Sequence, residues 1–300
     1  MIKNKKILIT GINGFLGTNL AQKLKNDNEI IGISQSKTQE FGNIAVIEGD
    51  VSNERVFDQI NLELDLIFHF GSPTSIVLFK QDPEKYFNNT VTGMTNILNF
   101  AKNNSIDKLI YPSSGSVYGN NPLPHSEDIT PRPSNQYGAA KIKCEYLAEK
   151  YSDDVDSTGL RIFAAYGPGE EKKQNLSSVV NLFLQDVKRN ESPIIFGDGT
   201  QTRDFMYIDD VIQSIIISSE LSNQKIINVG SGISTSFNKI IETISNQIDK
   251  KIIPRYIKKE SAYIENLKAD TNLMKSILKI EPISIESGIE KFVKYLNLLN

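Results

Sequence analysis

A tyrosine and a lysine four residues apart, Tyr137 and Lys141, have the spacing and the chemistry for proton transfer. On an α-helix, residues at this spacing lie on one face, about one turn apart. An ammonium beside a phenol favours the ionised phenolate, which can act as a base. Since a free tyrosine has a pKa of about 10, a pKa near 7 needs roughly 4 kcal/mol of extra stabilisation of the phenolate. The same spacing is common on ordinary amphipathic helices, so it predicts chemistry only together with a nucleotide-binding loop and a third hydroxyl.

A glycine-rich turn of the required kind follows the first apolar stretch. Residues 7–10 are typical of a buried parallel strand, and residues 18–25 favour a helix. Strand, glycine-rich turn and helix in this order predict a dinucleotide site with the helix N-terminus facing the pyrophosphate. The spacing is G-x-x-G-x-x-G rather than G-x-G-x-x-G. The residues of this turn that we expect to bind the cofactor are Gly11, Asn13, Gly14, Phe15, Leu16 and Gly17.

The second predicted strand, residues 29–33, should end at the adenosine ribose. Proteins that prefer NAD usually place Asp or Glu there to hold the 2′-hydroxyl. This chain has Ser34, Gln35, Ser36 and Lys37 instead. Ser34 or Gln35 can bond the ribose, whereas Lys37 can bind the 2′-phosphate of NADP because no carboxylate repels it. The sequence therefore leaves NAD and NADP both open.

The next two predicted strands also end at the expected cofactor site. Residues 45–51 place Asp50 where it can accept a hydrogen bond from the adenine amino group, and residues 65–70 should run under the cofactor. His69 has apolar neighbours, which favour a packed histidine over a catalytic one. Residues 83–103 are helical, with a proline in the first turn. The further cofactor contacts that we expect in these segments are Asp50, Val51, Phe70, Gly71, Ser72 and Asn89.

A fifth predicted strand, residues 108–111, leads to the third hydroxyl, Ser114. A hydroxyl at the carboxyl end of a strand in an open parallel sheet points into the ligand crevice. The proline-rich residues 122–133 favour a loop, which leads into the helix that carries Tyr137 and Lys141. The three catalytic candidates are thus Ser114, Tyr137 and Lys141.

The rest of the chain completes an α/β fold. Residues 158–163 predict a sixth strand, and residues 206–219 and 225–229 should return to the sheet. We expect a Rossmann-type doubly wound parallel sheet with a smaller mixed α/β lid that binds the substrate. The cofactor domain should comprise residues 1–168 and 206–232, and the substrate domain residues 169–205 and 233–300.

Composition limits the class of protein. The chain has 300 residues, a net charge of −3 and one cysteine, Cys144. These values give no sign of binding to nucleic acid or membrane, and a single cysteine excludes an intrachain disulfide and fits a reducing cytoplasm. No apolar stretch is long enough for a signal peptide or for a membrane span of about 18 residues. We expect a cytoplasmic protein with no metal site.

Taken together, these segments resemble the extended short-chain dehydrogenase/reductase family, specifically its nucleotide-sugar epimerase/dehydratase branch, whose members include enzymes like UDP-glucose 4-epimerase. The motifs that carry the resemblance are Gly11-x-x-Gly14-x-x-Gly17, Gly49-Asp50-Val51, Asn89-Thr-x-x-Gly93-x-x-Asn96, Ser113-Ser114-x-x-Val117-Tyr118-Gly119, Tyr137-x-x-x-Lys141, Tyr166-Gly-Pro-Gly169 and Gln201-Thr-Arg203-Asp-Phe-x-Tyr-x-Asp-Asp210.

The resemblance implies roles for these residues. Tyr137 would take the proton from a sugar hydroxyl while hydride passes to nicotinamide, and Lys141 would bond the nicotinamide ribose and lower the tyrosine pKa. Ser114 would bond the reacting oxygen, Ser116 would contact the substrate, and Arg203 would meet the nucleotide diphosphate. The family also implies a homodimer in which helices 83–103 and 135–151 form a four-helix bundle with their copies.

The residue types just before Tyr118 indicate which reaction of the family to expect. Relatives that eliminate water or decarboxylate usually carry a glutamate two residues before this tyrosine, and often an aspartate before that, whereas this chain has Gly115 and Ser116. Small residues there resemble the 4-epimerases, so we expect NAD-dependent 4-epimerisation of a nucleotide sugar, most simply a UDP-hexose.

Three departures from the family keep alternatives open. Ala164 replaces a frequent asparagine, only Lys258 and Lys259 stand near the place of a frequent C-terminal arginine, and no acid follows strand two. An NADPH-dependent reductase of 4-keto nucleotide sugars is therefore the alternative, and a non-catalytic NAD(P)-binding sensor is a third hypothesis.

Overall fold

A seven-stranded sheet forms the centre of the fold in a computed structural model that describes residues 2–36, 41–42, 44–258 and 264–298. The strand order is β10-β6-β5-β4-β1-β2-β3. Its members are β1 (Lys6–Thr10), β2 (Glu29–Ser34), β3 (Ala45–Glu48), β4 (Leu66–His69), β5 (Lys108–Ser114), β6 (Ser157–Ile162) and β10 (Ile226–Val229). β1 pairs in parallel with both β2 and β4, and the pairs β2–β3 and β4–β5 are also parallel. This order reverses direction between β1 and β4, as in a Rossmann sheet, so the predicted fold class is confirmed.

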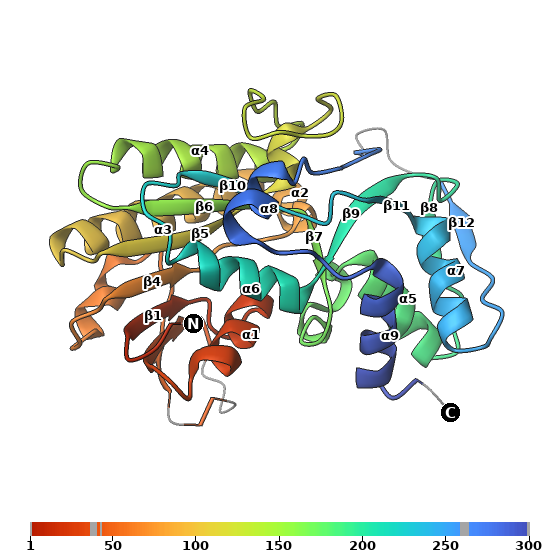
Figure 1. Cartoon of the computed structure of the whole chain (residues 1–300), viewed down its shortest axis with the longest axis horizontal. Coiled ribbons are helices and arrows are strands. Elements are labelled where there is room, and N and C mark those ends of the chain that lie inside the picture. The colour runs from red at the N-terminus through yellow and green to blue at the C-terminus, as the bar shows by residue number, and fades with distance from the viewer. Residues whose placement is uncertain (1, 37–40, 43, 259–263, 299–300) are drawn as a thin grey trace. The chain divides into compact units, whose positions relative to one another are not determined.

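Helices cover both faces of this sheet (Figure 1). On one face lie α3 (Pro83–Asn103) and α4 (Gln136–Lys150), and on the other lie α1 (Phe15–Leu24) and the C-terminal part of α6 (Ile208–Ser218). The core under α3 and α4 joins Leu8, Ile67 and Leu109 of the sheet to Ile97 and Leu98 of α3. Because strand residues alternate between the faces, the neighbours of these sheet residues serve the other layer.

Helix α3 has the predicted limits, and its apolar stripe faces the sheet. Met94, Ile97 and Leu98 are almost fully buried in the core, whereas Phe87 and Val91 are half-buried. The helix begins with Pro83 after the N-cap Asp82, whose carboxylate accepts a hydrogen bond from the Lys85 amide. Cys144 of α4 is buried in the same core, as a packing residue would be.

The prediction that residues 206–219 return to the sheet is wrong. Residues 206–207 end β9 (Thr202–Tyr207), which belongs to a separate sheet, and residues 208–218 form α6. The physical reason lies in the sequence, since the buried apolar residues of this segment follow the helical period rather than the period of two. They are Ile208, Val211, Ile212, Ile215 and Ile216. Only the later segment, β10, adds a strand to the large sheet.

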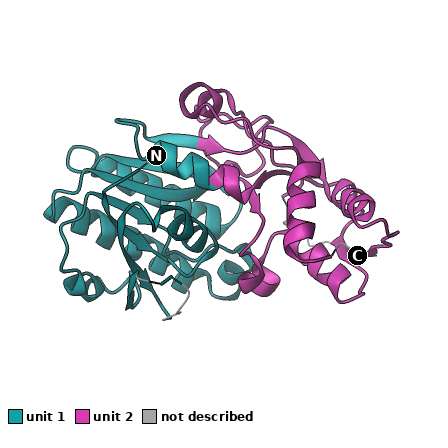
Figure 2. Ribbon diagram, turned by 60° about the horizontal axis from the view of Figure 1, so that its bottom comes forward, with its two compact units in different colours: residues 1–117, 133–161, 212–227 teal, residues 118–132, 162–211, 228–300 magenta. Residues whose placement is uncertain are grey.

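The chain divides into two compact units, shown in Figure 2. Unit 1 comprises residues 1–117, 133–161 and 212–227, and unit 2 comprises residues 118–132, 162–211 and 228–300. The predicted division into a cofactor domain and a substrate domain stays a prediction.

Unit 2 contains two small sheets. One has the order β11-β9-β7, from β7 (Ala164–Tyr166), β9 and β11 (Ser234–Ser236), and the other pairs β8 (Ile194–Phe196) with β12 (Arg255–Ile257). The helices of this unit are α5 (Val179–Lys188), α7 (Phe237–Gln247), α8 (Asn272–Leu278) and α9 (Ile285–Tyr295). The remaining helical segments of the chain are η1 (Glu54–Gln59), α2 (Ile76–Gln81), η2 (Gly115–Tyr118) and η3 (Glu171–Leu176).

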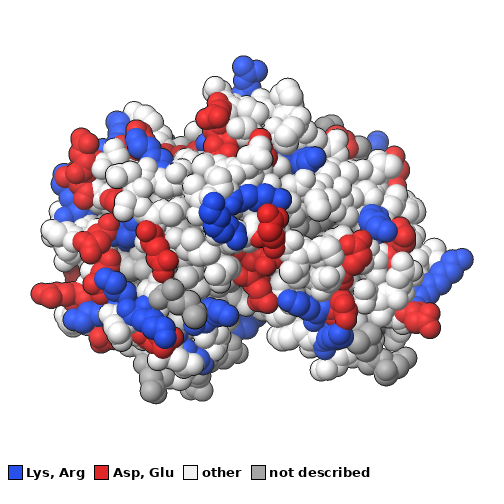
Figure 3. Space-filling model, in the orientation of Figure 1, with Lys and Arg blue, Asp and Glu red and all other residues white. Residues whose placement is uncertain are grey.

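The charged side chains visible in Figure 3 are interspersed by sign over that face. This pattern agrees with a net charge of only −3. Within the described ranges, no helix combines the length and the apolar character that crossing a bilayer requires.

The core under α3 gives a stability prediction. Leu98 has no exposed side-chain surface, so Leu98→Ala should lower the free energy of unfolding by about 2–5 kcal/mol through lost burial and a residual cavity. Thr92→Ala, on the exposed side of the same helix, should change it by less than about 0.5 kcal/mol. Urea unfolding followed by circular dichroism measures both. Equal values for the two variants would contradict the assignment of the buried face.

Candidate active site

The turn between β1 and α1 approaches the end of β4 so closely that it requires glycine. Gly11 has φ +66°, and a Cβ atom there would lie 2.6 Å from the carbonyl carbon of Phe70 and 2.7 Å from the Gly71 amide nitrogen. A Cβ atom at Gly17 would lie 2.3 Å from the Gly11 carbonyl oxygen. The amide of Gly11 donates to the Ile33 carbonyl at 2.7 Å, which ties the turn to the end of β2 as well. Three strand ends therefore meet at this turn.

The N-terminus of α1 fits a pyrophosphate. The N-cap is Gly14, which has no side chain to cover the helix end, and the first turn contains no acidic residue. Backbone amides and the helix dipole at such an end favour an anion. Asn13 Nδ2 donates to the Ser36 carbonyl, which fixes the loop beside this end, while Phe15 is buried and Leu16 half-buried beneath it. The residues predicted to bind a dinucleotide at this turn therefore leave the helix end open to a pyrophosphate.

The ends of β2 and β3 are joined by side-chain hydrogen bonds. Gln35 Nε2 donates to Asp50 Oδ2 at 2.8 Å, and the other carboxylate oxygen accepts from the Ser52 amide at 2.8 Å. The Ser34 carbonyl accepts from the Gly49 amide at 2.8 Å, so the two strand ends are held in register. Lys37 lies outside the described residues. The adenine contact of Asp50 and the ribose contact of Ser34 stay predictions.

Val51 is packed rather than exposed at this edge. Its carbonyl accepts from Asn96 Nδ2 of α3 at 3.0 Å, and its side chain lies where Cβ atoms at Gly71 and Gly93 would have to fit. Asn89, one turn earlier on α3 than Gly93, is half-buried. These contacts hold α3 close to the end of β4.

His69 is a packed histidine. It is buried at the end of β4, and its Nδ1 lies 2.9 Å from Thr10 Oγ1, which in turn accepts from the Gly71 amide at 3.0 Å. Burial, together with the positive charge of Lys141, lowers the pKa of His69 to about 3. The imidazole is therefore neutral at pH 7, and its bond to Thr10 joins the ends of β1 and β4. Thr10 was missed in the sequence because nothing marks one threonine at a strand end as a link.

Tyr137, Ser114 and Lys141 lie together in unit 1. The Tyr137 hydroxyl is hydrogen-bonded to Ser114, the last residue of β5. Lys141 Nζ lies 5.8 Å from the centre of the Tyr137 ring and donates to Ser72 Oγ, after β4, at 3.1 Å. The predicted catalytic residues are thus neighbours, and Ser72 joins them.

Burial sets the protonation of this cluster. It raises the pKa of Tyr137, and the hydrogen bond from Ser114 opposes part of this rise. It also lowers the pKa of Lys141, against the attraction of Glu145. The sequence predicts a lowered tyrosine pKa, whereas the protein groups alone raise it because desolvation outweighs the hydrogen bond.

Close backbone contact also fixes α4 beside the serine loop. A Cβ atom at Gly138 would lie 2.7 Å from the Ser116 carbonyl oxygen, so this glycine allows α4 to start against η2. Asn135 caps the helix through its side chain, which accepts from the Gly138 amide. The Ser116 amide donates to Ser114 Oγ at 3.1 Å, which orients that hydroxyl.

Phe79 is a site neighbour that the sequence did not reveal. It is buried on α2, and its ring meets the edge of the Tyr137 ring with the centroids 5.5 Å apart. The contact restricts the orientation of the phenol. One apolar residue in a short helix gives no signal of this kind.

Arg203 is described within unit 2. Its guanidinium donates from Nη1 to the Thr202 carbonyl at 2.8 Å and to the Glu265 carbonyl at 3.2 Å, and it lies over the Phe237 ring. These contacts hold the guanidinium plane at the start of β9. Its contact with a diphosphate stays a prediction, as does the substrate contact of Ser116.

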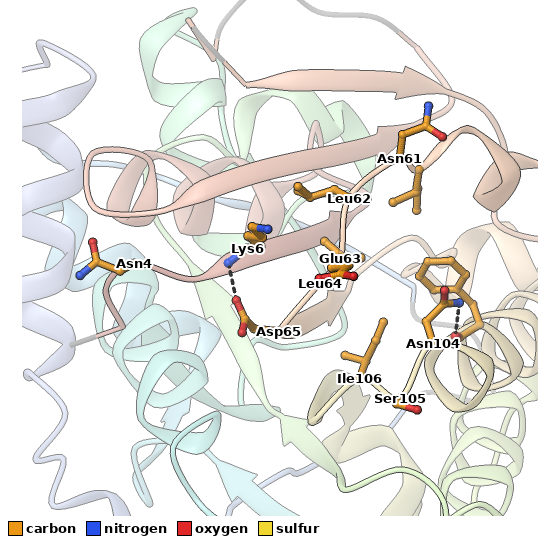
Figure 4. A pocket seen from close by; sticks show the side chains of 12 residues that line it. Asn4, Lys6, Asn61, Leu62, Glu63, Leu64, Asp65, Asn104, Ser105 and Ile106 are labelled. Atoms are coloured by element: carbon orange, nitrogen blue, oxygen red, sulfur yellow. Dashed lines mark hydrogen bonds between the residues drawn. The ribbon is translucent and has the colours of Figure 1, made fainter.

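A polar hollow of about 780 Å³ lies at the opposite edge of the sheet (Figure 4). Its lining comes from Lys6, the first residue of β1, and from the segments that precede β1, β4 and β5, including Asp65 and Asn104. Cofactors in open α/β sheets bind at the carboxyl ends of the strands, so this hollow is separate from the site. Among the described residues, no three or more His, Cys, Asp or Glu side chains form a group that could hold a metal ion.

Comparison with known protein families agrees with this geometry. Residues 7–230 match the family described as NAD dependent epimerase/dehydratase. The chain belongs to this family. The match runs from β1 to the residue after β10, and so includes the glycine turn and the Ser114–Tyr137–Lys141 cluster. The predicted family is confirmed. The protein is therefore an enzyme of the epimerase class, and its cofactor is NAD.

Relatives within this family match over nearly their full lengths. A putative UDP-glucose 4-epimerase of Methanocaldococcus jannaschii is 28% identical, covering 97% of this chain and 98% of the relative. The UDP-N-acetylglucosamine 4-epimerase from Methanobrevibacter ruminantium, solved with UDP-N-acetylmuramic acid, has a TM-score of 0.90 at 28% identity and covers 99% of both chains. The UDP-glucuronic acid 4-epimerase from Bacillus cereus, solved with UDP-glucuronic acid and NAD, has a TM-score of 0.85 at 26% identity, over 97% of this chain and 99% of that one.

The glycine turn gives a prediction with a matched control. Gly11→Ala should raise the Kd for NAD about tenfold or more, because the new methyl group forces the turn away from Phe70 and Gly71. Gly42 has nearly the same φ, +65°, but no atom within 4 Å of a Cβ, so Gly42→Ala should show only the strain of about 1 kcal/mol or more that a left-handed alanine carries. Calorimetric titration with NAD, beside urea unfolding, separates the two effects. Equal NAD affinity for both variants would contradict the role of the turn.

The neutral state of His69 predicts a pH dependence of stability. Its pKa is lower in the folded chain than in the unfolded chain, so its contribution is present above pH 6.5 and is lost as the pH falls toward 3. Between pH 7 and pH 5 this histidine should remove about 2 kcal/mol from the free energy of unfolding. In His69→Asn that loss should be absent, which urea unfolding at both pH values measures. The same loss in the variant and the wild type would show that His69 titrates normally.

Proposed function

We propose that this protein is an NAD-dependent 4-epimerase of a nucleotide-diphosphate sugar, with Tyr137 as the base. The observation that carries the proposal is the cluster in which the Tyr137 hydroxyl bonds Ser114 and Lys141 stands one helical turn away. A half-buried phenol, a hydroxyl and an ammonium suffice to move one proton to and from a sugar oxygen.

Each residue has a distinct part in this scheme. Bound NAD would supply the acceptor for the C4 hydride and the donor that returns it. Tyr137 takes the proton from the C4 hydroxyl and later gives one back, so the sugar passes through a 4-keto form with no net gain or loss of electrons. Ser114 donates a hydrogen bond to the same oxygen. Lys141 stabilises the tyrosinate, for which its ammonium form is needed.

The residues beside the cluster favour epimerisation over elimination of water. Gly115 and Ser116 occupy the positions of η2 next to Ser114, and neither side chain can serve as a second acid or base at neutral pH. A reaction that needs only one base and one hydroxyl matches this set. The 4-epimerases among the relatives support the same assignment.

The substrate that we propose is a UDP-hexose. The relatives named above are described as acting on, or bound to, UDP-sugars. Arg203 would meet the diphosphate, for which the planar guanidinium fork suits two oxygens. UDP-glucose, UDP-N-acetylglucosamine and UDP-glucuronate are the three substrates to compare.

We further propose that the protein acts in the cytoplasm as a homodimer built on α3 and α4. The single buried cysteine fits a reducing compartment. The outer face of α4 carries Tyr146, which is 50% exposed between Lys143 and Lys150. Sedimentation that gives a monomer at every concentration would exclude the dimer.

The decisive test is Tyr137→Phe, with Tyr146→Phe of the same helix as the control. Loss of the phenolic oxygen should lower kcat by about 10²- to 10⁴-fold while NAD stays bound, because the base is removed and the turn is intact. Tyr146→Phe should keep the wild-type kcat. The measurement is interconversion of the C4 epimers of each UDP-sugar, together with chromatography of the nucleotide released on denaturation.

Two outcomes would contradict the proposal. Unchanged turnover in Tyr137→Phe would exclude the mechanism. Release of NADP, with consumption of NADPH once per turnover, would identify a reductase instead.

A further inference from the structure

A buried ion pair lies two helical turns from the proposed base. Glu145 of α4 and Arg161 of β6 have side chains only 10% and 5% exposed. Arg161 Nη2 donates to Glu145 Oε2 at 2.7 Å and Nε donates to Oε1 at 3.0 Å, so the contact is bidentate. Ser113 of β5 also donates to Glu145 Oε1. One carboxylate therefore joins α4 to two neighbouring strands.

This network and the proposed catalytic cluster join the same elements. Tyr137, Lys141 and Glu145 follow one another at intervals of four residues, which places them along one ridge of α4. Ser113 and Ser114 are consecutive residues at the end of β5. The pair Ser113–Glu145 and the pair Ser114–Tyr137 therefore join the same strand end to the same helix, about 12 Å apart along the helix axis.

We propose that Glu145 and Arg161 are positioning residues for the reaction, which fix the rotation and the axial position of α4 so that Tyr137 meets Ser114. The inference rests on the proposed function. A bidentate contact with a guanidinium fixes direction as well as distance, and a helix joined to β5 at two points cannot roll. With only the Ser114 contact, rotation of α4 would carry the phenol away from the hydroxyl.

The geometry distinguishes this pair from other ion pairs of the helix. Glu149, one turn further along α4, bonds Lys225, but those two side chains are 54% and 58% exposed. An exposed pair between flexible side chains holds little in place, whereas a buried bidentate pair is strongly directional. The charge of Glu145 also raises the pKa of Lys141, which helps to keep the ammonium protonated in its buried position.

The test replaces the whole network with apolar side chains of similar size. The triple variant Ser113→Ala, Glu145→Met, Arg161→Met removes one negative and one positive charge, so the local net charge is unchanged. Apolar replacements of buried ion pairs often keep or increase stability. If the network positions α4, kcat should fall about 10²-fold, as expected for a displacement of about 1 Å, while KM and the Kd for NAD change less than about threefold.

The pH profile supplies a second readout, which a role in folding alone would not move. If Tyr137 is displaced from Ser114 and Lys141, its ionised form is less stabilised and the acid limb of the kcat profile moves to higher pH. Glu145→Gln tests the same point if the triple variant does not fold. It keeps the shape of the side chain but leaves the Arg161 charge unpaired, and electrostatics alone would move the limb to lower pH.

The matched control is the double variant Glu149→Gln, Lys225→Met, which removes the exposed pair of the same helix. It should keep the wild-type kcat and pH profile. A triple variant that folds with wild-type kcat and an unmoved limb would overturn the positioning role, as would a Glu145→Gln limb at lower pH. Tyr137→Phe measured alongside separates the two proposals, since its full activity would refute the proposed function and its inactivity beside an active triple variant would refute only this inference.

Discussion

The close approach of backbone to backbone at the carboxyl edge of the sheet is the constraint on which the rest of the site depends. The β1–α1 turn touches the end of β4 at Gly11, and α4 begins against the serine loop at Gly138. Neither contact leaves room for a Cβ atom. Because these two contacts bring β1, β4, β5 and α4 together at the carboxyl ends of the strands, the proposed catalytic side chains lie close to one another. Helix α4 lies within reach of Ser114 and Ser72 for the same reason.

The chemistry of the cluster is governed by the balance between burial and charge. Desolvation moves Tyr137 and Lys141 toward their neutral forms, although the proposed mechanism uses the ionised form of each. Hydrogen bonds and the nearby carboxylate oppose this tendency only in part. A site built in this way holds the phenol protonated until further positive charge is present, which suits a base that must return the proton it has taken.

Much of this arrangement could be predicted from the sequence, because several of its causes are local. The period of the apolar residues predicts β1 and α3, and the glycine spacing predicts the turn. The i, i+4 spacing places Tyr137 and Lys141 together. The prediction for residues 206–219 was wrong. The high apolar content of this segment is compatible with a buried strand, but its apolar residues recur at the helical period, and residues 208–218 form α6. Phe79 and Thr10, and the contact of Ser72 with Lys141, depend on residues distant in sequence, which no local pattern contains. The raised pKa of Tyr137 could not be predicted from the sequence either, because the desolvation that causes it depends on the whole fold.

The place of β10 at the edge of the large sheet bears on how the chain folds during synthesis. The first six strands of that sheet, and all three residues of the proposed catalytic cluster, are complete once residue 162 has been made. The strand that covers β6 follows only at residues 226–229. A nascent chain therefore carries a nearly finished sheet in which β6, the strand that β10 later covers, is an edge strand while the ribosome adds the intervening segment. During that interval the backbone groups of β6 that later pair with β10 are open to pairing with another chain.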